Sequence, residues 1–183
     1  MDASTSIGAN NWIYQTQMAA NITKYFDVQQ NRVRFAAITF NRIPVKEFDL
    51  KDYTSQKSLE KALLAIPYPG IEGTRTDLAL ALITDKNMFG TEAGGRDGIP
   101  HLVIVMTDGY ATEDKKALEE ATKLKVKGTL ILTVGISQDI SQSELEGMAS
   151  SKDNVIKATS YSLLDYSMHA LVKRTCDNVK TAG

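Results

Sequence analysis

Three short segments of the 183-residue chain carry carboxylate and hydroxyl side chains at spacings that suit a metal ion. They are DASTS at 2–6, GTRT at 73–76 and TDG at 107–109. Alternate residues of an extended segment project to the same side, so Asp2, Ser4 and Ser6 can face one ion together. No cysteine or histidine falls in these segments. Oxygen ligands with few charges favour a hard cation, Mg²⁺ or Mn²⁺, that keeps some of its waters.

Each segment also has a simpler structural interpretation. Residues 2–6 and the two threonines of 73–76 are of types that cap helices, and Asp108-Gly109 is a common turn after a strand. The three segments together, in this order and beside the elements described next, favour the metal site over separate caps and turns.

The spacing of apolar residues predicts the elements that must position these segments. Strands are predicted at 32–40, 44–50, 101–107, 129–136 and 154–158, and helices at 9–27, 58–66, from 77 onward, 113–127, 141–150 and 162–179. Strands that alternate with helices predict an α/β, doubly wound fold, with a mostly parallel central sheet and helices on both faces. Ligands of such sheets bind beyond the carboxyl ends of the strands. Ser141 and Glu144 predict a capping box at the start of helix 141–150.

Composition limits the classes of protein to consider. Hydrophobic residues make up 43% of the chain and charged residues 23%, so we expect one globular domain over 1–183. The net charge of −1 offers no field for phosphate backbones, so nucleic acid is not an expected partner. Apolar runs such as 102–106 are too short to span a bilayer.

The chain resembles a von Willebrand factor type A domain, the module also called an I or A domain in integrins and matrix proteins. The resemblance rests on DASTSIG at 2–8, RVRFAAITF at 32–40, GTRTDLALAL at 73–82, LVIVMTDG at 102–109, LILTVGI at 130–136 and a final helix ending in Cys176. It covers nearly the whole chain and implies a Rossmann-like fold. It also implies a metal-ion-dependent adhesion site built from three loops.

Carried over by position, the resemblance assigns five residues to the metal: Asp2, Ser4, Ser6, Thr74 and Asp108. It implies that the two serines bind through their hydroxyls, that Thr74 binds directly or through water, and that the carboxylates act largely through waters. The expected ion is Mg²⁺, with Mn²⁺ and Ca²⁺ as alternatives. An open coordination position would take an Asp or Glu carboxylate from a protein partner. Neighbours of the loops in sequence would form the ligand rim: Ile7, Gly8, Asn10, Arg75 and Tyr110.

One part of the family pattern is missing, namely the apolar first strand that ends at the first aspartate. Because this strand lies in the middle of the family's sheet, we expect its two neighbours to have open edges. We therefore expect the domain to be truncated at its N-terminus relative to the family. Extracellular members often pair a cysteine before that strand with one after the last helix, so the partner of Cys176 is expected in the same missing segment.

The leading functional hypothesis is a metal-dependent adhesion module of a secreted, multidomain matrix or cell-adhesion protein, which binds collagen or another matrix protein. An alternative is an intracellular A domain that serves as an assembly scaffold. A less favoured alternative is a metal-dependent hydrolase. We predict no enzyme activity, because the sequence shows no nucleophile–base pattern, no P-loop and no G-x-G-x-x-G motif.

Overall fold

The computed structural model describes residues 1–136 and 140–158. The helices in these residues are α1 (Gly8–Thr23), α2 (Gln56–Leu64), α3 (Thr76–Asp85), α4 (Asp114–Val126) and α5 (Gln142–Met148), with short 3-10 turns at Thr91–Ala93 and Lys152–Asn154. The strands are β1 (Ala37–Thr39), β2 (Val45–Phe48), β3 (Leu102–Thr107), β4 (Leu130–Ile136) and β5 (Val155–Ala158). None of the described helices has the length and apolar character needed to cross a membrane.

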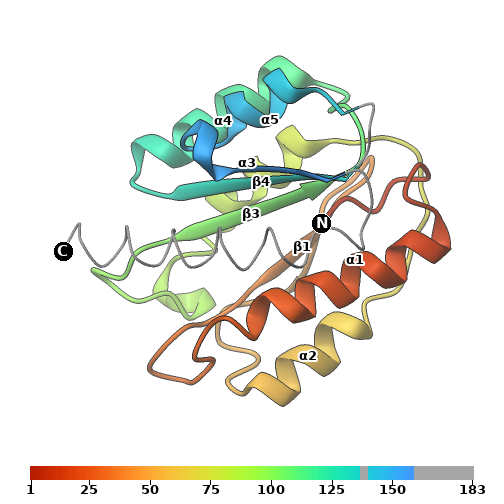
Figure 1. Ribbon diagram of the computed structural model, residues 1–183. Coiled ribbons are helices and arrows are strands. Elements are labelled where there is room, and N and C mark those ends of the chain that lie inside the picture. The colour runs from red at the N-terminus through yellow and green to blue at the C-terminus, as the bar shows by residue number, and fades with distance from the viewer. Residues whose placement is uncertain (137–139, 159–183) are drawn as a thin grey trace.

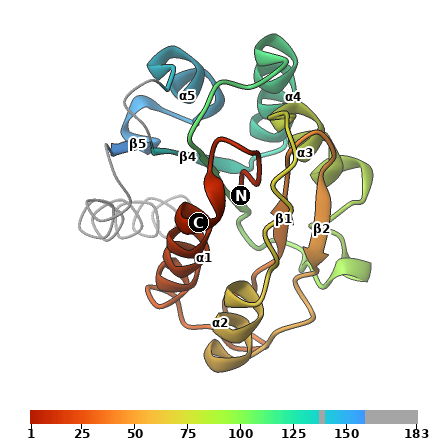
Figure 2. The same cartoon turned by 90° about the vertical axis from the view of Figure 1, so that its right-hand side faces the viewer.

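The strands form two groups that a short N-terminal segment joins. β3, β4 and β5 form a parallel sheet, in which Val105 lies opposite Thr133 and Thr133 opposite Val155. β1 and β2 form an antiparallel pair. In Figure 2 the N-terminus lies between β1 and β2 on one side and β4 and β5 on the other. Residues 1–3 therefore connect the two groups into one twisted layer.

Helices cover both faces of this layer, as the doubly wound prediction requires. In Figure 1, α1 and α2 lie on one face, and α3, α4 and α5 lie on the other. Successive residues of a strand face opposite sides. Met106 accordingly packs in the core on the α1 side with Leu132 and Val134, whereas Val105 packs on the opposite side with Ile131. The α/β, Rossmann-like fold class is confirmed.

The segment Met1–Ala3 is bonded to both groups of strands. The Asp2 N–H donates to the Met106 carbonyl at 2.9 Å, while the Ala3 N–H donates to the Phe40 carbonyl at 2.6 Å. The Phe40 N–H donates in turn to the Met1 carbonyl at 3.0 Å. This short ladder lies at the carboxyl ends of β1 and β3.

Beyond Met1, toward the amino ends of the same strands, the space between β1 and β3 is an apolar cavity of about 480 Å³. Its wall includes Ala37 and Ile38 of β1 and Leu102 and Ile104 of β3. We call this cavity the slot. Within the described residues β1 pairs as a strand only with β2, and β3 only with β4, so the expected open edges are present.

Two sequence predictions need correction. The strand predicted at 32–40 is confined to Ala37–Thr39, because residues 34–36 run along the slot without a partner strand. The capping box is half formed: Ser141 Oγ accepts from the Glu144 N–H at 3.2 Å, but the Glu144 carboxylate accepts from the Ala111 N–H at 3.0 Å instead of returning to Ser141. The predicted helix 162–179 and Cys176 lie outside the described residues.

Candidate metal centre

A row of hydrogen-bonded oxygens joins the first loop to the third. The Ser4 N–H donates to Asp2 Oδ1 at 3.0 Å, which folds the loop over the carboxylate. Ser4 Oγ and Ser6 Oγ are 2.9 Å apart, and Ser6 Oγ donates to Asp108 Oδ1 at 2.9 Å. Four of the five predicted ligands therefore lie side by side at the carboxyl edge of the sheet, although 102 residues separate Ser6 from Asp108 in sequence.

The two carboxylates of this row are arranged in a way that favours a cation. Asp2 is fully buried, and burial raises its pKa, while hydrogen bonds from Thr107 and Ser4 act in the opposite direction. Burial also raises the pKa of Asp108, and the charge of Asp2 adds to that rise. In the described residues no lysine or arginine pairs with either carboxylate. A bound divalent ion would offset both the burial and the repulsion, so the residues present fit such an ion.

Thr107, the last residue of β3, fixes the orientation of the Asp2 carboxylate. Its hydroxyl donates to Asp2 Oδ2 at 2.7 Å, so both oxygens of the buried carboxylate are bonded. Gln15 of α1 holds the same residue through the backbone, since its Nε2 donates to the Asp2 carbonyl at 2.5 Å. The first loop is thus tied to β3 on one side and to α1 on the other.

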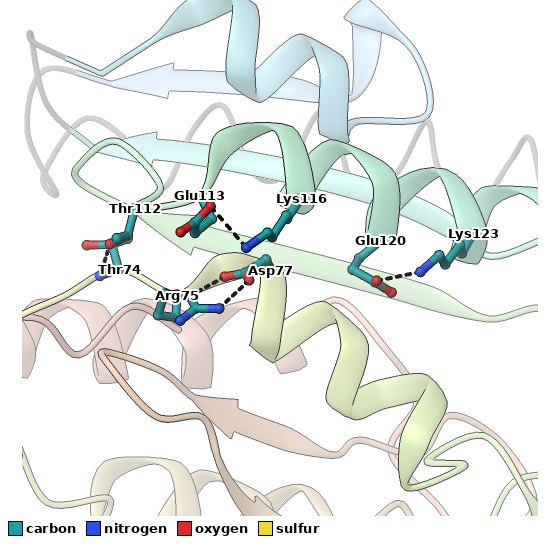
Figure 3. Close-up of polar contacts among 8 residues, drawn as sticks. All are labelled: Thr74, Arg75, Asp77, Thr112, Glu113, Lys116, Glu120 and Lys123. Carbon is teal, nitrogen blue, oxygen red and sulfur yellow. Dashed lines mark hydrogen bonds and ion pairs between the residues drawn. The ribbon is translucent and has the colours of Figure 1, made fainter.

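The second loop is pinned to the third by Thr74. Its N–H donates to Thr112 Oγ1 at 3.0 Å, and its carbonyl accepts from the Thr112 N–H at 2.9 Å (Figure 3). The second loop also lies close to the backbone of Arg42. This approach needs Gly73, at φ +101°, because a Cβ there would lie 3.3 Å from that backbone. Thr74 is nearly buried, and the hydrogen bonds of its backbone run to Thr112 rather than to the oxygen row.

The side chain of Arg75 is held in place by an ion pair with Asp77. Its Nε and one terminal nitrogen each donate to an oxygen of Asp77 at 2.7 Å, which is a two-pronged ion pair (Figure 3). Asp77 is buried in the first turn of α3, and the Arg75 guanidinium lowers its pKa. The pair therefore fixes the Arg75 guanidinium next to Thr74, with its charge balanced by Asp77.

The predicted ligand rim is only partly at the surface. Tyr110 is 62% exposed and Asn10 is also exposed, while Gly8 begins α1 in a half-buried position. Ile7, in contrast, is 1% exposed and packs in the core on the α1 side. Adjacency in sequence could not show that Ile7 turns inward, because it gives no information about the direction of a side chain in an irregular loop.

Sequence reasoning missed four residues that support the loops: Gln15, Tyr68, Thr112 and Glu144. Tyr68 donates its hydroxyl to the Ser4 carbonyl at 2.9 Å, and Glu144 accepts from the Ala111 N–H in the third loop. Their partners lie 13 to 64 residues away in sequence. Only Thr112 carried a signal, namely its position just after the T-D-G segment.

Comparison with known proteins identifies the family. A family profile for the von Willebrand factor type A domain matches residues 1–170. The chain is 31% identical over 180 residues to the collagen alpha-5(VI) chain of Mus musculus; this match covers 97% of the present chain and 7% of the collagen chain.

Several solved structures have the same fold as this chain. Proximal thread matrix protein 1 from the mussel byssus superposes with a TM-score of 0.89 at 23% identity, over 96% of this chain and 46% of that one. A second structure of the same protein, with a zinc-occupied MIDAS motif, gives 0.86 at 24% identity and the same coverage. Manganese-loaded Plasmodium vivax TRAP gives 0.78 at 20% identity, over 94% and 70% of the two chains. The chain belongs to the von Willebrand factor type A domain family.

Proposed function

We propose that this domain is a divalent-metal-dependent protein-binding module of an extracellular matrix or cell-adhesion protein. In this proposal Asp2, Ser4, Ser6, Thr74 and Asp108 hold the ion. The observation that carries it is the chain of hydrogen bonds from Asp2, through the Ser4 N–H and the hydroxyls of Ser4 and Ser6, to Asp108, which joins two loops at the carboxyl edge of the sheet.

The chemistry of the donor set supports recognition of a carboxylate. A bound divalent ion supplies positive charge and an open coordination position, which an Asp or Glu of the partner protein can fill. In this proposal the ion is bound directly by the neutral hydroxyls of Ser4, Ser6 and Thr74, while Asp2 and Asp108 act largely through waters, so a partner carboxylate would be its direct anionic ligand. Oxygen ligands and retained waters favour Mg²⁺, with Mn²⁺ and Ca²⁺ as the alternatives. The zinc- and manganese-loaded relatives support a divalent ion without selecting one.

The surface around the oxygen row provides contacts for the partner. Tyr110 and Asn10 are exposed, and Arg75 is held in place by Asp77. An exposed aromatic ring beside a bound ion suits an acidic residue flanked by apolar groups, whereas the charge of Arg75 is already balanced by Asp77. Ile7 is left out of this surface because its side chain is buried.

The collagen relative bears on the setting of the domain. An extracellular location agrees with that relative, and the chain spans only a small part of its length. We propose a secreted, multidomain parent whose partner is collagen or another matrix protein. No contact in the described residues specifically favours the intracellular scaffold or the hydrolase, so neither is carried further.

A thermal melt tests the metal site directly. The wild type and Asp108→Ala are melted in EDTA and then with Mg²⁺, Mn²⁺ or Ca²⁺. An ion at a hundred times its Kd stabilises the folded state by about 2.7 kcal/mol, which raises Tm by roughly 5 to 10 °C. We expect that shift in the wild type and its loss in Asp108→Ala. The matched control is Asp97→Ala, which removes an exposed carboxylate before β3, at the other end of the sheet.

A binding assay then tests the partner. Immobilised collagen is exposed to the domain with Mg²⁺, with EDTA, and with Mg²⁺ plus free acetate as a competing carboxylate. Binding that needs the ion and is lost in Asp108→Ala is the expected result. A wild type that is folded but shows no Tm shift with any of the three ions contradicts the proposal.

A further inference from the structure

Tyr68 lies outside the three loops, yet its hydroxyl reaches the first of them. The residue belongs to the connection between α2 and α3, between Pro67 and Pro69. Its hydroxyl donates to the Ser4 carbonyl at 2.9 Å and accepts from the Gly8 N–H at 3.1 Å. One side chain therefore bonds both ends of the turn 4–8, which carries the hydroxyls of Ser4 and Ser6.

The ring of Tyr68 is itself held in place by Trp12. The two rings are 5.6 Å apart between centroids, with an angle of 34° between their planes. Trp12 is 4% exposed, and its indole N–H donates to the Ile66 carbonyl at 3.0 Å, two residues before Tyr68. The connection that carries Tyr68 is thus bonded to α1, and the Tyr68 hydroxyl points toward the first loop.

The bond to Gly8 closes the start of α1. Gly8 has φ +69°, and as the first residue of the helix it has no carbonyl within the helix to accept its N–H. Tyr68 supplies that acceptor. The same bond fixes the place where the first loop becomes helix, two residues after Ser6.

We propose that Tyr68 is a positioning residue of the metal centre, which sets the affinity for divalent ions by holding Ser4 and Ser6 in line with Asp108. This inference rests on the proposed function of the site. A loop that is already ordered loses little conformational entropy when it binds an ion, whereas a loose loop must be ordered at that moment. Tyr68 supplies this order from outside the loop.

The test is Tyr68→Phe, which keeps the ring against Trp12 and removes only the hydroxyl. Calorimetric titration with Mg²⁺ and with Mn²⁺ alone measures the Kd of the ion, and a melt in EDTA measures the stability of the metal-free domain. Because Tyr68 is partly exposed, water can replace the lost bonds in the metal-free state. We expect Kd to rise about fivefold, the equivalent of one net hydrogen bond, while Tm in EDTA changes little.

Tyr53→Phe is the matched control. Its ring packs edge-on against Phe48 at 4.9 Å, in the connection between β2 and α2. That connection follows β2, which runs antiparallel to β1, so it lies at the end of the sheet opposite the metal centre. Loss of this hydroxyl should leave the Kd of both ions unchanged.

Intrinsic fluorescence gives a second readout, because Trp12 is the single tryptophan of the chain and touches Tyr68. We expect Mg²⁺ to change the Trp12 emission in the wild type and to change it less in Tyr68→Phe at saturating ion. A variant with wild-type Kd overturns the role of Tyr68, whether or not its Tm falls, and leaves the proposed function intact. A wild type that binds neither ion overturns the proposed function, and this inference with it.

Discussion

The two ends of the space between β1 and β3 differ in how they are filled. At the carboxyl end, Met1–Ala3 bonds to both strands, and Asp2 and Ser4 are buried above them. At the amino end the same two strands border the slot. Burial along β3 follows this division: Val105 and Met106 are buried, whereas Leu102 and Ile104 are partly exposed.

This difference separates the contacts that position the metal centre from the apolar surface whose burial would stabilise the fold. A backbone ladder of three residues is enough to place Asp2 against Thr107 and the third loop. The walls at the amino end of the slot, such as Leu102 and Ile104, lie away from that ladder and leave hydrophobic surface that burial would stabilise. We infer that the metal centre and the slot can be altered separately.

The amino group of Met1 lies at the end of the slot nearest the metal centre. The Met1 nitrogen donates to the Ile38 carbonyl at 2.8 Å, so the ladder of Met1–Ala3 points toward the slot. Burial lowers the pKa of this amino group from 8.0 to about 5. A peptide nitrogen in the same place would make the bond without a charge to bury. Residues engineered ahead of Met1 would therefore be directed along the slot between β1 and β3.

Filling the slot should have the largest effect on stability. An extension of about five β-prone apolar residues ahead of Met1 would span roughly 17 Å of strand. Burial of several apolar side chains, less the entropy of ordering them, should raise the free energy of unfolding by about 3 kcal/mol and Tm by roughly 6 to 12 °C. The measurement is a thermal melt in EDTA.

A Gly-Ser extension of the same length is the control for this change and should leave Tm nearly unchanged. The Kd for Mg²⁺ should be similar in all three chains, because the slot does not contact the oxygen row. Equal gains from the apolar and the Gly-Ser extensions would show that the slot does not take a strand.

Breaking the Arg75–Asp77 pair, at the carboxyl end of the sheet, should have the second largest effect on stability. Asp77→Asn removes a partly buried, two-pronged ion pair and should lower the free energy of unfolding by about 1 to 3 kcal/mol at neutral pH. The folded-state pKa of Asp77 is lowered, so its contribution is present at neutral pH and is lost as pH falls through that lowered value.

Urea unfolding at about pH 7 and about pH 3 measures this difference. The gap between wild type and Asp77→Asn should shrink at the lower pH. Glu113→Gln, which weakens the more exposed pair with Lys116, is the control and should change stability little at either pH. A gap that stays constant with pH would argue against the ion pair as the source.

Glu144 offers a smaller test of the third loop. Burial raises its pKa, the charge of Asp114 adds to the rise, and the bond from the Ala111 N–H opposes it. Stability from this group is therefore fully present at low pH and lost as pH rises through the raised pKa. Glu144→Gln keeps an acceptor for Ala111 without the charge, so it should be equal to or up to about 1 kcal/mol more stable than wild type at neutral pH.

Glu144→Ala removes the acceptor and should cost about 1 kcal/mol at every pH. Urea unfolding at about pH 4 and about pH 8 compares the three proteins. The advantage of Glu144→Gln should be confined to the higher pH. If both variants are equally unstable, the carboxylate charge is required and the interpretation is wrong.

The smallest effect is expected at a surface ion pair that is part of neither end. Glu120 and Lys123 lie 2.6 Å apart on α4, and the lysine side chain is well exposed (Figure 3). Lys123→Ala should change the free energy of unfolding by less than about 0.5 kcal/mol, as exposed pairs usually do. Chemical unfolding of this variant sets the baseline against which the other changes are judged.

The elements that the sequence predicted best are the long periodic ones. Helix α4 and strands β3 and β4 lie where the apolar spacing placed them, because each has a buried face of its own, whereas α1 ends at Thr23, four residues before the predicted end. The strand predicted at 32–40 came out short, since a strand also needs a partner and residues 34–36 have the slot beside them. No local pattern could predict that Ile7 is buried or that the Glu144 carboxylate accepts from the Ala111 N–H.

The sequence by itself determined the alternation of strands and helices and the residue types of the three loops. Those properties depend on neighbours a few residues apart, and spacing records them. Only the tertiary structure decided that Ser6 meets Asp108, that Thr112 pins Thr74 and that Tyr68 bonds both ends of the first loop. Such contacts join segments far apart in the chain, and they form because the twist and order of the strands bring their carboxyl ends to one edge.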